Sequence, residues 1–143
     1  MYAMRTYNKL VEFVKSMGVY YAERNILRRG VCGLYYDSEK LIVVDPTLPI
    51  ADKISTLLHE YGHHLTVGLP YADDPHREEF LASLFAIQTV GMFGGDPAGE
   101  VHNLRRYRWD QTTEAERQFI RYHVQTMVEQ FCLTIGLRSV IAL

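Results

Sequence analysis

The chain has 143 residues, of which 48% are hydrophobic and 22% are charged. A chain of this length can bury about two thirds of its unfolded surface, and the composition excludes a disordered protein. The formal net charge of -2 argues against a general binder of polyanions.

The first half of the chain predicts a helix, a hairpin and a second helix. Apolar residues recur at helical spacing over residues 4–17, whereas residues 19–29 suit either a short helix or a strand. Residues 31–36 and 41–44 are rich in β-branched and aromatic side chains around a polar break, which predicts a β-hairpin. Pro49 then suits the first turn of a helix with the apolar stripe Ile54, Leu57, Leu58, Tyr61 and Leu65.

The second half predicts two further helices. An acidic loop over residues 71–76 precedes a strongly apolar helix over residues 78–90, and residues 91–99 interrupt it. Residues 113–116 fit a capping box that opens a last helix, whose stripe we expect in the core: Ile120, Val124, Met127, Val128, Phe131 and Ile135. Together these elements predict one α+β domain over residues 1–143, with a small sheet packed against a bundle of helices.

The segment from His59 to His63 is an H-E-x-x-H sequence on the helix that follows Pro49. Residues four apart lie on one face of a helix, so both imidazoles can bind a single Zn²⁺. Glu60 then lies beside the open coordination position and can take a proton from the metal's water. The motif indicates a metal-dependent peptidase.

Catalytic zinc sites usually have a third protein ligand. The downstream candidates are Asp73, Asp74, His76, Glu78 and Glu79. A metzincin would have Gly and His where this chain has Thr66 and Leu69, so that pattern is excluded. A thermolysin-like arrangement takes its Glu from the next helix, which favours the helix that begins near Glu78. Asp73 and Asp74 lie in the connecting loop, where we expect solvated side chains.

The H-E-x-x-H motif is followed by a second one, Glu79-x-x-Ala82-x-x-Phe85-Ala86. Over residues 30–90, the two motifs and the preceding hairpin resemble the ImmA/IrrE metallopeptidase family. The resemblance implies a small zincin-like domain in which His59, His63 and Glu79 bind zinc and Glu60 is the general base and acid. The chain departs from the family over residues 87–91, where an L-L-M-P-like segment is common, and no motif marks the substrate-facing residues.

The sequence does not determine the third ligand or the donor for the oxyanion. Glu79 also suits the N-terminal turns of a helix, in which case Glu78 or His76 would bind the metal. His64 follows His63 by one residue and points about 100° away, so we expect a helix-surface side chain. A donor for the transition-state oxyanion is expected among His102, Tyr122 and His123.

We therefore expect a zinc-dependent endopeptidase that hydrolyses a protein substrate. By the family resemblance, this substrate would be a helix-turn-helix repressor of a phage or mobile element. One alternative is a peptide-deformylase-like hydrolase with Cys32 as third ligand, although the residues around Cys32 do not match that family's motifs. Another is a non-catalytic zinc-binding regulatory module, which would have no need of Glu60.

The remaining features concern location and partners. The N-terminus has no apolar run of signal-peptide length, and the apolar stretch over residues 131–143 is too short to span a bilayer, so we expect a cytoplasmic protein. Cys32 and Cys132 are far apart, and we expect two buried thiols. Residues 105–109 interleave arginines with aromatic residues, but in a slightly acidic domain we expect a solvated face or a protein contact rather than a nucleic-acid site.

Overall fold

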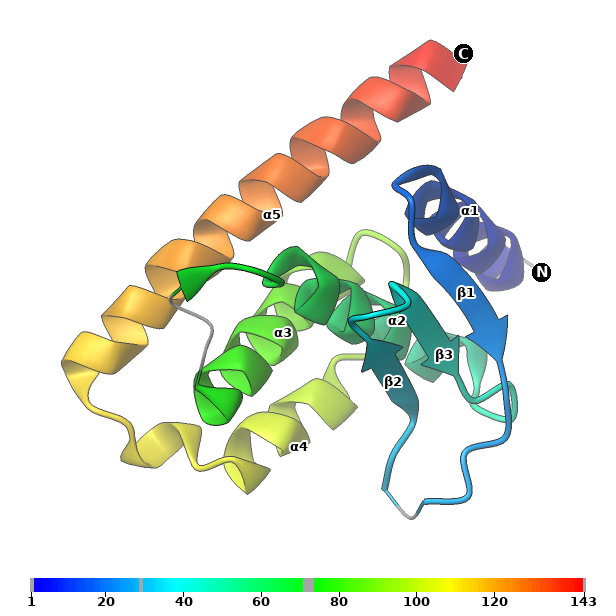
Figure 1. Ribbon diagram of the computed structural model, residues 1–143. Helices are drawn as coiled ribbons and strands as arrows, with labels where there is room; N and C mark the ends of the chain where they lie inside the picture. Colours follow the sequence, from blue (N-terminus) through cyan, green and yellow to red (C-terminus); the bar gives the residue numbers. More distant parts are fainter. Residues whose placement is uncertain (1, 29, 71–73, 143) are drawn as a thin grey trace.

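The computed structural model describes residues 2–28, 30–70 and 74–142. Within these residues the protein has five α-helices, a short 3₁₀-helix and a three-stranded sheet, which confirms the predicted α+β class (Figure 1). The elements follow in the order α1 (Tyr2–Ser16), β1 (Tyr20–Glu23), β2 (Gly33–Tyr36), β3 (Leu41–Val44), α2 (Ile50–Leu65), α3 (Pro75–Val90), α4 (Ala98–Arg106), η2 (Trp109–Gln111) and α5 (Glu114–Ala142).

The sheet has the strand order β1-β3-β2. β2 and β3 pair antiparallel, with Gly33 opposite Val44, which confirms the predicted hairpin. β1 pairs parallel to β3 on its other side. The sequence pattern does not distinguish helix from strand at β1, because pairing with a neighbouring strand determines the conformation of such a short segment more than its own β propensity does.

Helix α2 packs against the sheet on one side and against α3 on another (Figure 1). It contributes four fully or nearly fully buried apolar side chains to the core: Ile54, Leu57, Leu58 and Tyr61. α3 comes closest at Gly62, where a Cβ atom would lie 3.0 Å from the Cα of Ala82. Because both residues at this crossing are small, the two helix backbones can approach, and α3 lies directly beside the H-E-x-x-H turn.

Neither α4 nor η2 is predicted by the sequence pattern. Helix α3 ends near residue 91 as expected, but a new helix begins at Ala98. Of the residues of α4, all of which are described, only Glu100 is buried, so no apolar periodicity marks the helix. A local signal does exist at Asp96, whose carboxylate accepts a hydrogen bond from the N–H of Ala98 (2.9 Å).

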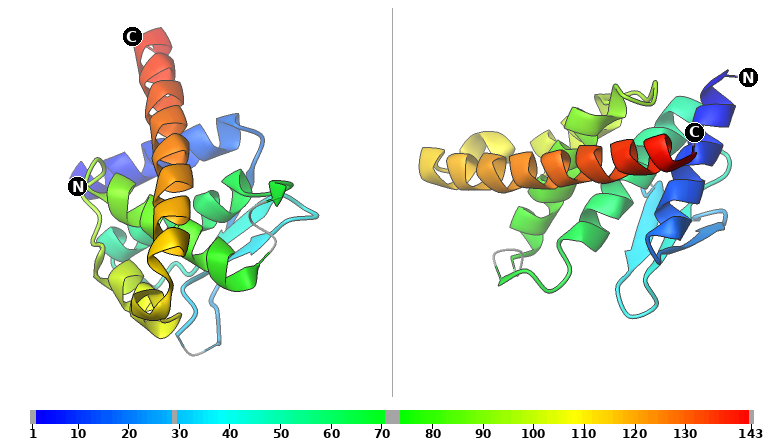
Figure 2. Two further views of the ribbon diagram at one scale, coloured as in Figure 1. Left: turned by 90° about the vertical axis from the view of Figure 1, so that its left-hand side faces the viewer. Right: turned by 90° about the horizontal axis from the view of Figure 1, so that it is seen from above.

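Helix α5 begins at a capping residue and packs on α3 through its first half. The N–H of Glu116 donates to Thr113 Oγ1 (3.1 Å), which is one of the two hydrogen bonds of the predicted capping box. The Glu116 carboxylate binds Arg77 of α3 at 2.7 and 2.9 Å. Four residues of the predicted stripe are buried: Ile120, Val124, Met127 and Phe131. The C-terminal part of the helix extends beyond the other elements (Figure 2). Among the described residues, no helix combines the length and the apolar composition needed to cross a membrane.

Phe85 tests how tightly this core is packed. Its ring is fully buried on α3 and contacts the rings of Tyr61 and Phe131. We predict that Phe85→Ala lowers the free energy of unfolding by about 3–5 kcal/mol, because the surrounding helices cannot close the cavity. Leu133→Ala, at a 65% exposed position, should lower it by less than about 0.5 kcal/mol. Urea denaturation measures both, and equal effects of the two substitutions would contradict the packing.

Candidate metal centre

Helix α2 presents His59 and His63 on one face because they are one helical turn apart. Their rings lie edge to face, with centroids 4.8 Å apart. His59 is buried at 6% exposure, and His63 is partly buried. Both side chains contact the N-terminal half of α3, so the next ligand is available from that helix.

The third residue of the cluster is Glu79, in the second turn of α3. One of its carboxylate oxygens lies 3.2 Å from His59 Nε2 and the other 3.1 Å from His63 Nε2. The two Nε2 atoms are 3.1 Å apart. One ligand atom from each residue thus lies within 4.8 Å of the other two, an arrangement that could hold a metal ion. The structure brings together the three residues proposed from the sequence, and metal binding by them stays a prediction.

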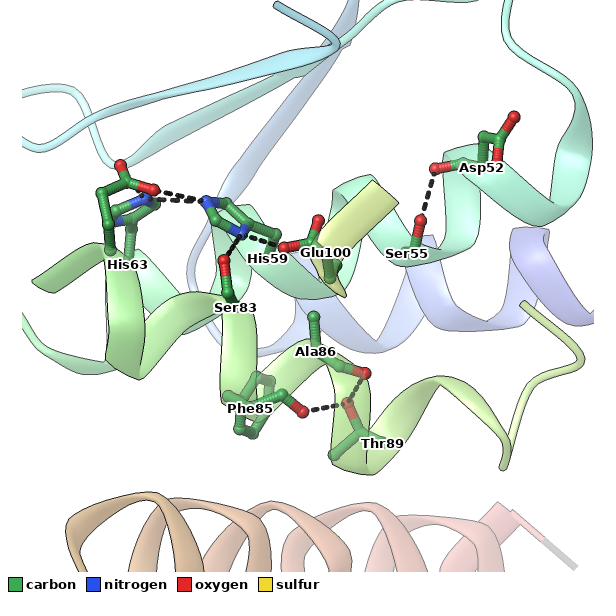
Figure 3. Close-up of polar contacts among 10 residues, drawn as sticks. Asp52, Ser55, His59, His63, Ser83, Phe85, Ala86, Thr89 and Glu100 are labelled. Atoms are coloured by element: carbon green, nitrogen blue, oxygen red, sulfur yellow. Dashed lines mark hydrogen bonds and ion pairs between the residues drawn. The ribbon is translucent and has the colours of Figure 1, made fainter. Parts of the chain in front are cut away.

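A second carboxylate contacts the outer nitrogen of each imidazole. His59 Nδ1 donates to Glu100 of α4 (2.7 Å), with Ser83 Oγ 3.4 Å from the same nitrogen (Figure 3). His63 Nδ1 donates to Glu78 (3.1 Å). These contacts fix both rings with Nε2 directed to the third ligand, as outer carboxylates do in metal sites.

The other candidates for a third ligand lie elsewhere. Glu78 lies at the Nδ1 side of His63 and is not part of the His59, His63 and Glu79 cluster. His76 is in the first turn of α3, also outside this cluster. Asp74 is the N-cap of α3, because its carboxylate accepts a hydrogen bond from the N–H of His76 (2.8 Å). Asp73 lies outside the described residues.

Glu100 is a site residue that the sequence pattern does not identify. It is 41 positions from His59, and its helix has no apolar stripe. It is nevertheless buried at 7% exposure. A carboxylate this deeply buried needs a charged or hydrogen-bonding partner, which is here an imidazole.

The charges of the cluster compensate one another. Burial opposes protonation of His59, but the carboxylates of Glu100 and Glu79 outweigh it and raise the pKa of His59 well above its usual value. Burial also opposes protonation of His63, yet the hydrogen bonds to Glu78 and Glu79 raise its pKa to about 9. For Glu79, burial would raise the pKa, but the two imidazoles lower it far below its usual value. Without bound metal, the raised pKa values favour protons on the rings, and these protons compete with a metal ion.

Glu60 is buried beside this cluster, at 7% exposure, and its side chain lines a cleft. Within the described residues, no hydrogen bond or ion pair holds its carboxylate. Burial raises its pKa, against the opposing charges of His59 and His63. Gly33 of β2 makes room for it, since a Cβ there would lie 3.2 Å from Glu60 Cγ and 2.5 Å from Thr56 Cγ2.

The cleft has a volume of about 1060 Å³ and contains the three proposed ligands. β2 and the loop before it form one wall, and α4 forms the opposite wall through residues that include His102, Asn103, Arg106 and Tyr107. His102 is thus the one sequence candidate for an oxyanion donor that lines the cleft. Tyr122 and His123 lie on α5 and are not among the described residues that line it.

Two further residues of interest lie near the motif. Cys32 lines the same cleft, but it is not part of the ligand cluster. Cys32 and Cys132 are free thiols. Cys32 is exposed and Cys132 is only partly buried, so the expectation of two buried thiols is wrong. His64 is partly buried, and its Nδ1 lies 2.8 Å from the hydroxyl of Tyr35, a contact that ties β2 to α2.

Comparisons with protein-family models, with curated proteins and with solved structures find no match to this chain. The chemistry of the site therefore has to follow from its own residues.

Glu100 should affect metal affinity without being a ligand. Glu100→Gln preserves the size of the side chain but removes the charge that holds the His59 Nδ1–H, so we predict a 10- to 100-fold weaker affinity for Zn²⁺, as is typical of such outer residues. Cys32→Ala, in the same cleft, should leave the affinity unchanged. Competition with a chromophoric chelator measures both. Unchanged affinity in Glu100→Gln would contradict its orienting role, and a loss in Cys32→Ala would favour a cysteine ligand.

Metal affinity should also rise with pH. Because the pKa of His63 is raised to about 9 and that of His59 is also raised, protons compete with a metal ion for these rings near pH 7. A metal ion has to displace these protons, so we predict an increase of about 10-fold or more in Zn²⁺ affinity per pH unit between pH 6 and pH 8. Chelator competition at each pH, corrected for protonation of the chelator, measures it. A Zn²⁺ affinity that does not change between pH 6 and pH 8 would contradict the raised pKa values of His59 and His63.

Proposed function

We propose that this protein is a zinc-dependent endopeptidase. His59, His63 and Glu79 are the zinc ligands in this proposal, and Glu60 is the general base and acid. The observation that supports it most is the convergence of three ligand atoms from two adjacent helices, beside Glu60, whose carboxylate is held by no hydrogen bond or ion pair among the described residues.

The donor atoms of the cluster suit zinc. Tetrahedral Zn²⁺ with bonds of about 2.0–2.2 Å has ligand atoms about 3.3 Å apart. The two Nε2 atoms, 3.1 Å apart, are close to this spacing. Glu79 contacts each of them with a different carboxylate oxygen, at 3.1 and 3.2 Å, and one ligand atom of each residue lies within 4.8 Å of the other two. Two protonated imidazoles at 3.1 Å would repel each other, whereas a cation held between unprotonated rings removes this repulsion. Two nitrogens and one carboxylate are also a common donor set for catalytic zinc.

Bound zinc would supply a Lewis acid that polarises the scissile carbonyl and lowers the pKa of the attacking water. Glu60 then accepts a proton from this water as the new C–O bond forms. It returns the proton to the amine nitrogen as the C–N bond breaks. Burial raises the pKa of Glu60 towards the range in which a carboxyl group can both accept and release a proton near neutral pH.

The cleft suits an extended peptide as substrate. β2 is an edge strand, since it pairs with β3 on one side only, and residues of β2 line the cleft. An edge strand offers unpaired backbone N–H and C=O groups to an added chain. A peptide paired with β2 would run past Glu60 and the proposed zinc ligands, and this supports hydrolysis of peptide bonds.

The second sequence motif supports a zincin-like metallopeptidase of the ImmA/IrrE type. Its apolar members, Ala82, Phe85 and Ala86, are fully buried and hold α3 against α2. Glu79 begins the same motif, one helical turn before Ala82, so the packing residues and the proposed ligand form one unit. From this resemblance we propose a protein substrate, with a helix-turn-helix repressor of a phage or mobile element as the first to be tested.

Glu60→Gln tests this mechanism. The amide cannot accept the proton, so we predict that the variant retains zinc and loses activity by about 100- to 10,000-fold. The assay is zinc-dependent cleavage of a proteome-derived peptide library, with products identified by mass spectrometry. Glu12→Gln, at an exposed position of α1, is the matched control and should retain full activity. Full activity in Glu60→Gln would refute the mechanism, and absence of cleavage by the zinc-loaded protein would refute an endopeptidase.

A further inference from the structure

The cleft has two ends that α2 and α4 define. The N–H of Asp96, before α4, donates to the carbonyl of Ala51 near the start of α2 (3.2 Å). Four residues later, Glu100 reaches His59 (2.7 Å). Both helices therefore advance in the same direction along the cleft, from an end near their first turns, past the proposed metal ligands, to an end near their last turns.

The two ends differ in charge. Asp52 lines the cleft at the first end, in the first turn of α2, and the next charged group towards the metal ligands is Glu100. Arg106 is the one arginine or lysine among the described residues that line the cleft, and it is on the last turn of α4, at the other end. That end also contains Asp37 of the β2-β3 turn. Among the described lining residues, the first end therefore has acidic groups and no arginine or lysine, whereas the second has charges of both signs.

Asp52 lines the cleft on the same helix as the proposed ligands His59 and His63. It precedes His59 by seven residues, or about 10 Å along a helix at about 1.5 Å per residue. Figure 3 shows both residues on the same helix, with the Asp52 carboxylate directed away from the other side chains drawn. No cation pairs with this carboxylate among the described residues.

The neighbourhood of Asp52 is consistent with a concentrated negative field. Although Cys32 is an exposed residue, partial desolvation of its thiol at the cleft wall raises the pKa of this thiol, and the charges of Asp52 and Glu100 raise it further. Carboxylates from α2 and α4 thus act on the same part of the cleft. Low-dielectric walls strengthen such a field and favour ligands of the opposite charge.

We propose that the Asp52 end of the cleft is a subsite for a lysine or arginine side chain of the peptide substrate. This inference rests on the proposed peptidase function and adds its substrate class. An extended chain advances about 3.3 Å per residue, so the basic residue lies about three residues from the scissile bond. Its ammonium or guanidinium group forms an ion pair with Asp52, and no described arginine or lysine lines this end of the cleft to oppose it.

The test measures binding separately from cleavage. Zinc-loaded Glu60→Gln protein is titrated into three fluorescein-labelled peptides that are identical except for Lys, Ala or Glu at one position. Fluorescence anisotropy should give affinities in the order Lys, Ala, Glu, with about a 10-fold or greater difference between Lys and Glu at low salt. Adding Asp52→Lys to this protein should reverse the order. Adding Asp37→Asn instead, which removes a carboxylate from the other end of the same cleft, should preserve it.

Equal affinities for the three peptides, or an unchanged order in the Asp52→Lys protein, would overturn the subsite. The peptidase proposal fails in a different way, if the zinc-loaded wild type cleaves no peptide of the library. The anisotropy order still decides the subsite in that case, because the acidic end does not depend on zinc. Efficient zinc-dependent cleavage without a preference for Lys or Arg near the cut bond would overturn the subsite alone.

Discussion

The close packing of α2 on α3 determines the geometry of the whole site. The two backbones approach at Gly62 and Ala82, where there is room for no larger side chain without movement. Gly62 is itself inside the H-E-x-x-H segment, so the residue that permits the approach is next to His63. As a result, the Glu79 carboxylate lies within 3.2 Å of both imidazoles, and a shift of one helix along the other would separate them.

Electrostatic compensation is the second requirement of the site. His59, Glu60 and Glu100 are all buried, and each would be costly to bury alone. His59 and Glu100 compensate each other, and Glu79 compensates both imidazoles. Glu60 faces the charges of both imidazoles, but no hydrogen bond or ion pair among the described residues holds its carboxylate, and the residue lines the cleft. A buried acidic group without a structural partner is common where proton transfer takes place.

The elements that hold the proposed ligands could be predicted from sequence because their signals are local. The helical spacing in α2, the apolar run of α3 and the polar break between β2 and β3 each lie within one segment. The role of Glu100 could not be predicted, because it depends on a contact over 41 positions and on a helix without an apolar stripe. The same limit applies to an oxyanion donor, since only the fold separates His102, on the cleft wall, from Tyr122 and His123 on α5.

X-ray absorption spectroscopy of the zinc-loaded protein is the most direct test of the three-residue centre. We predict only nitrogen and oxygen neighbours at about 2.0–2.2 Å, with the outer-shell scattering of two imidazoles. A sulfur neighbour at about 2.3 Å would contradict the centre and favour Cys32 as a ligand. Scattering from a single imidazole would likewise contradict joint binding by His59 and His63.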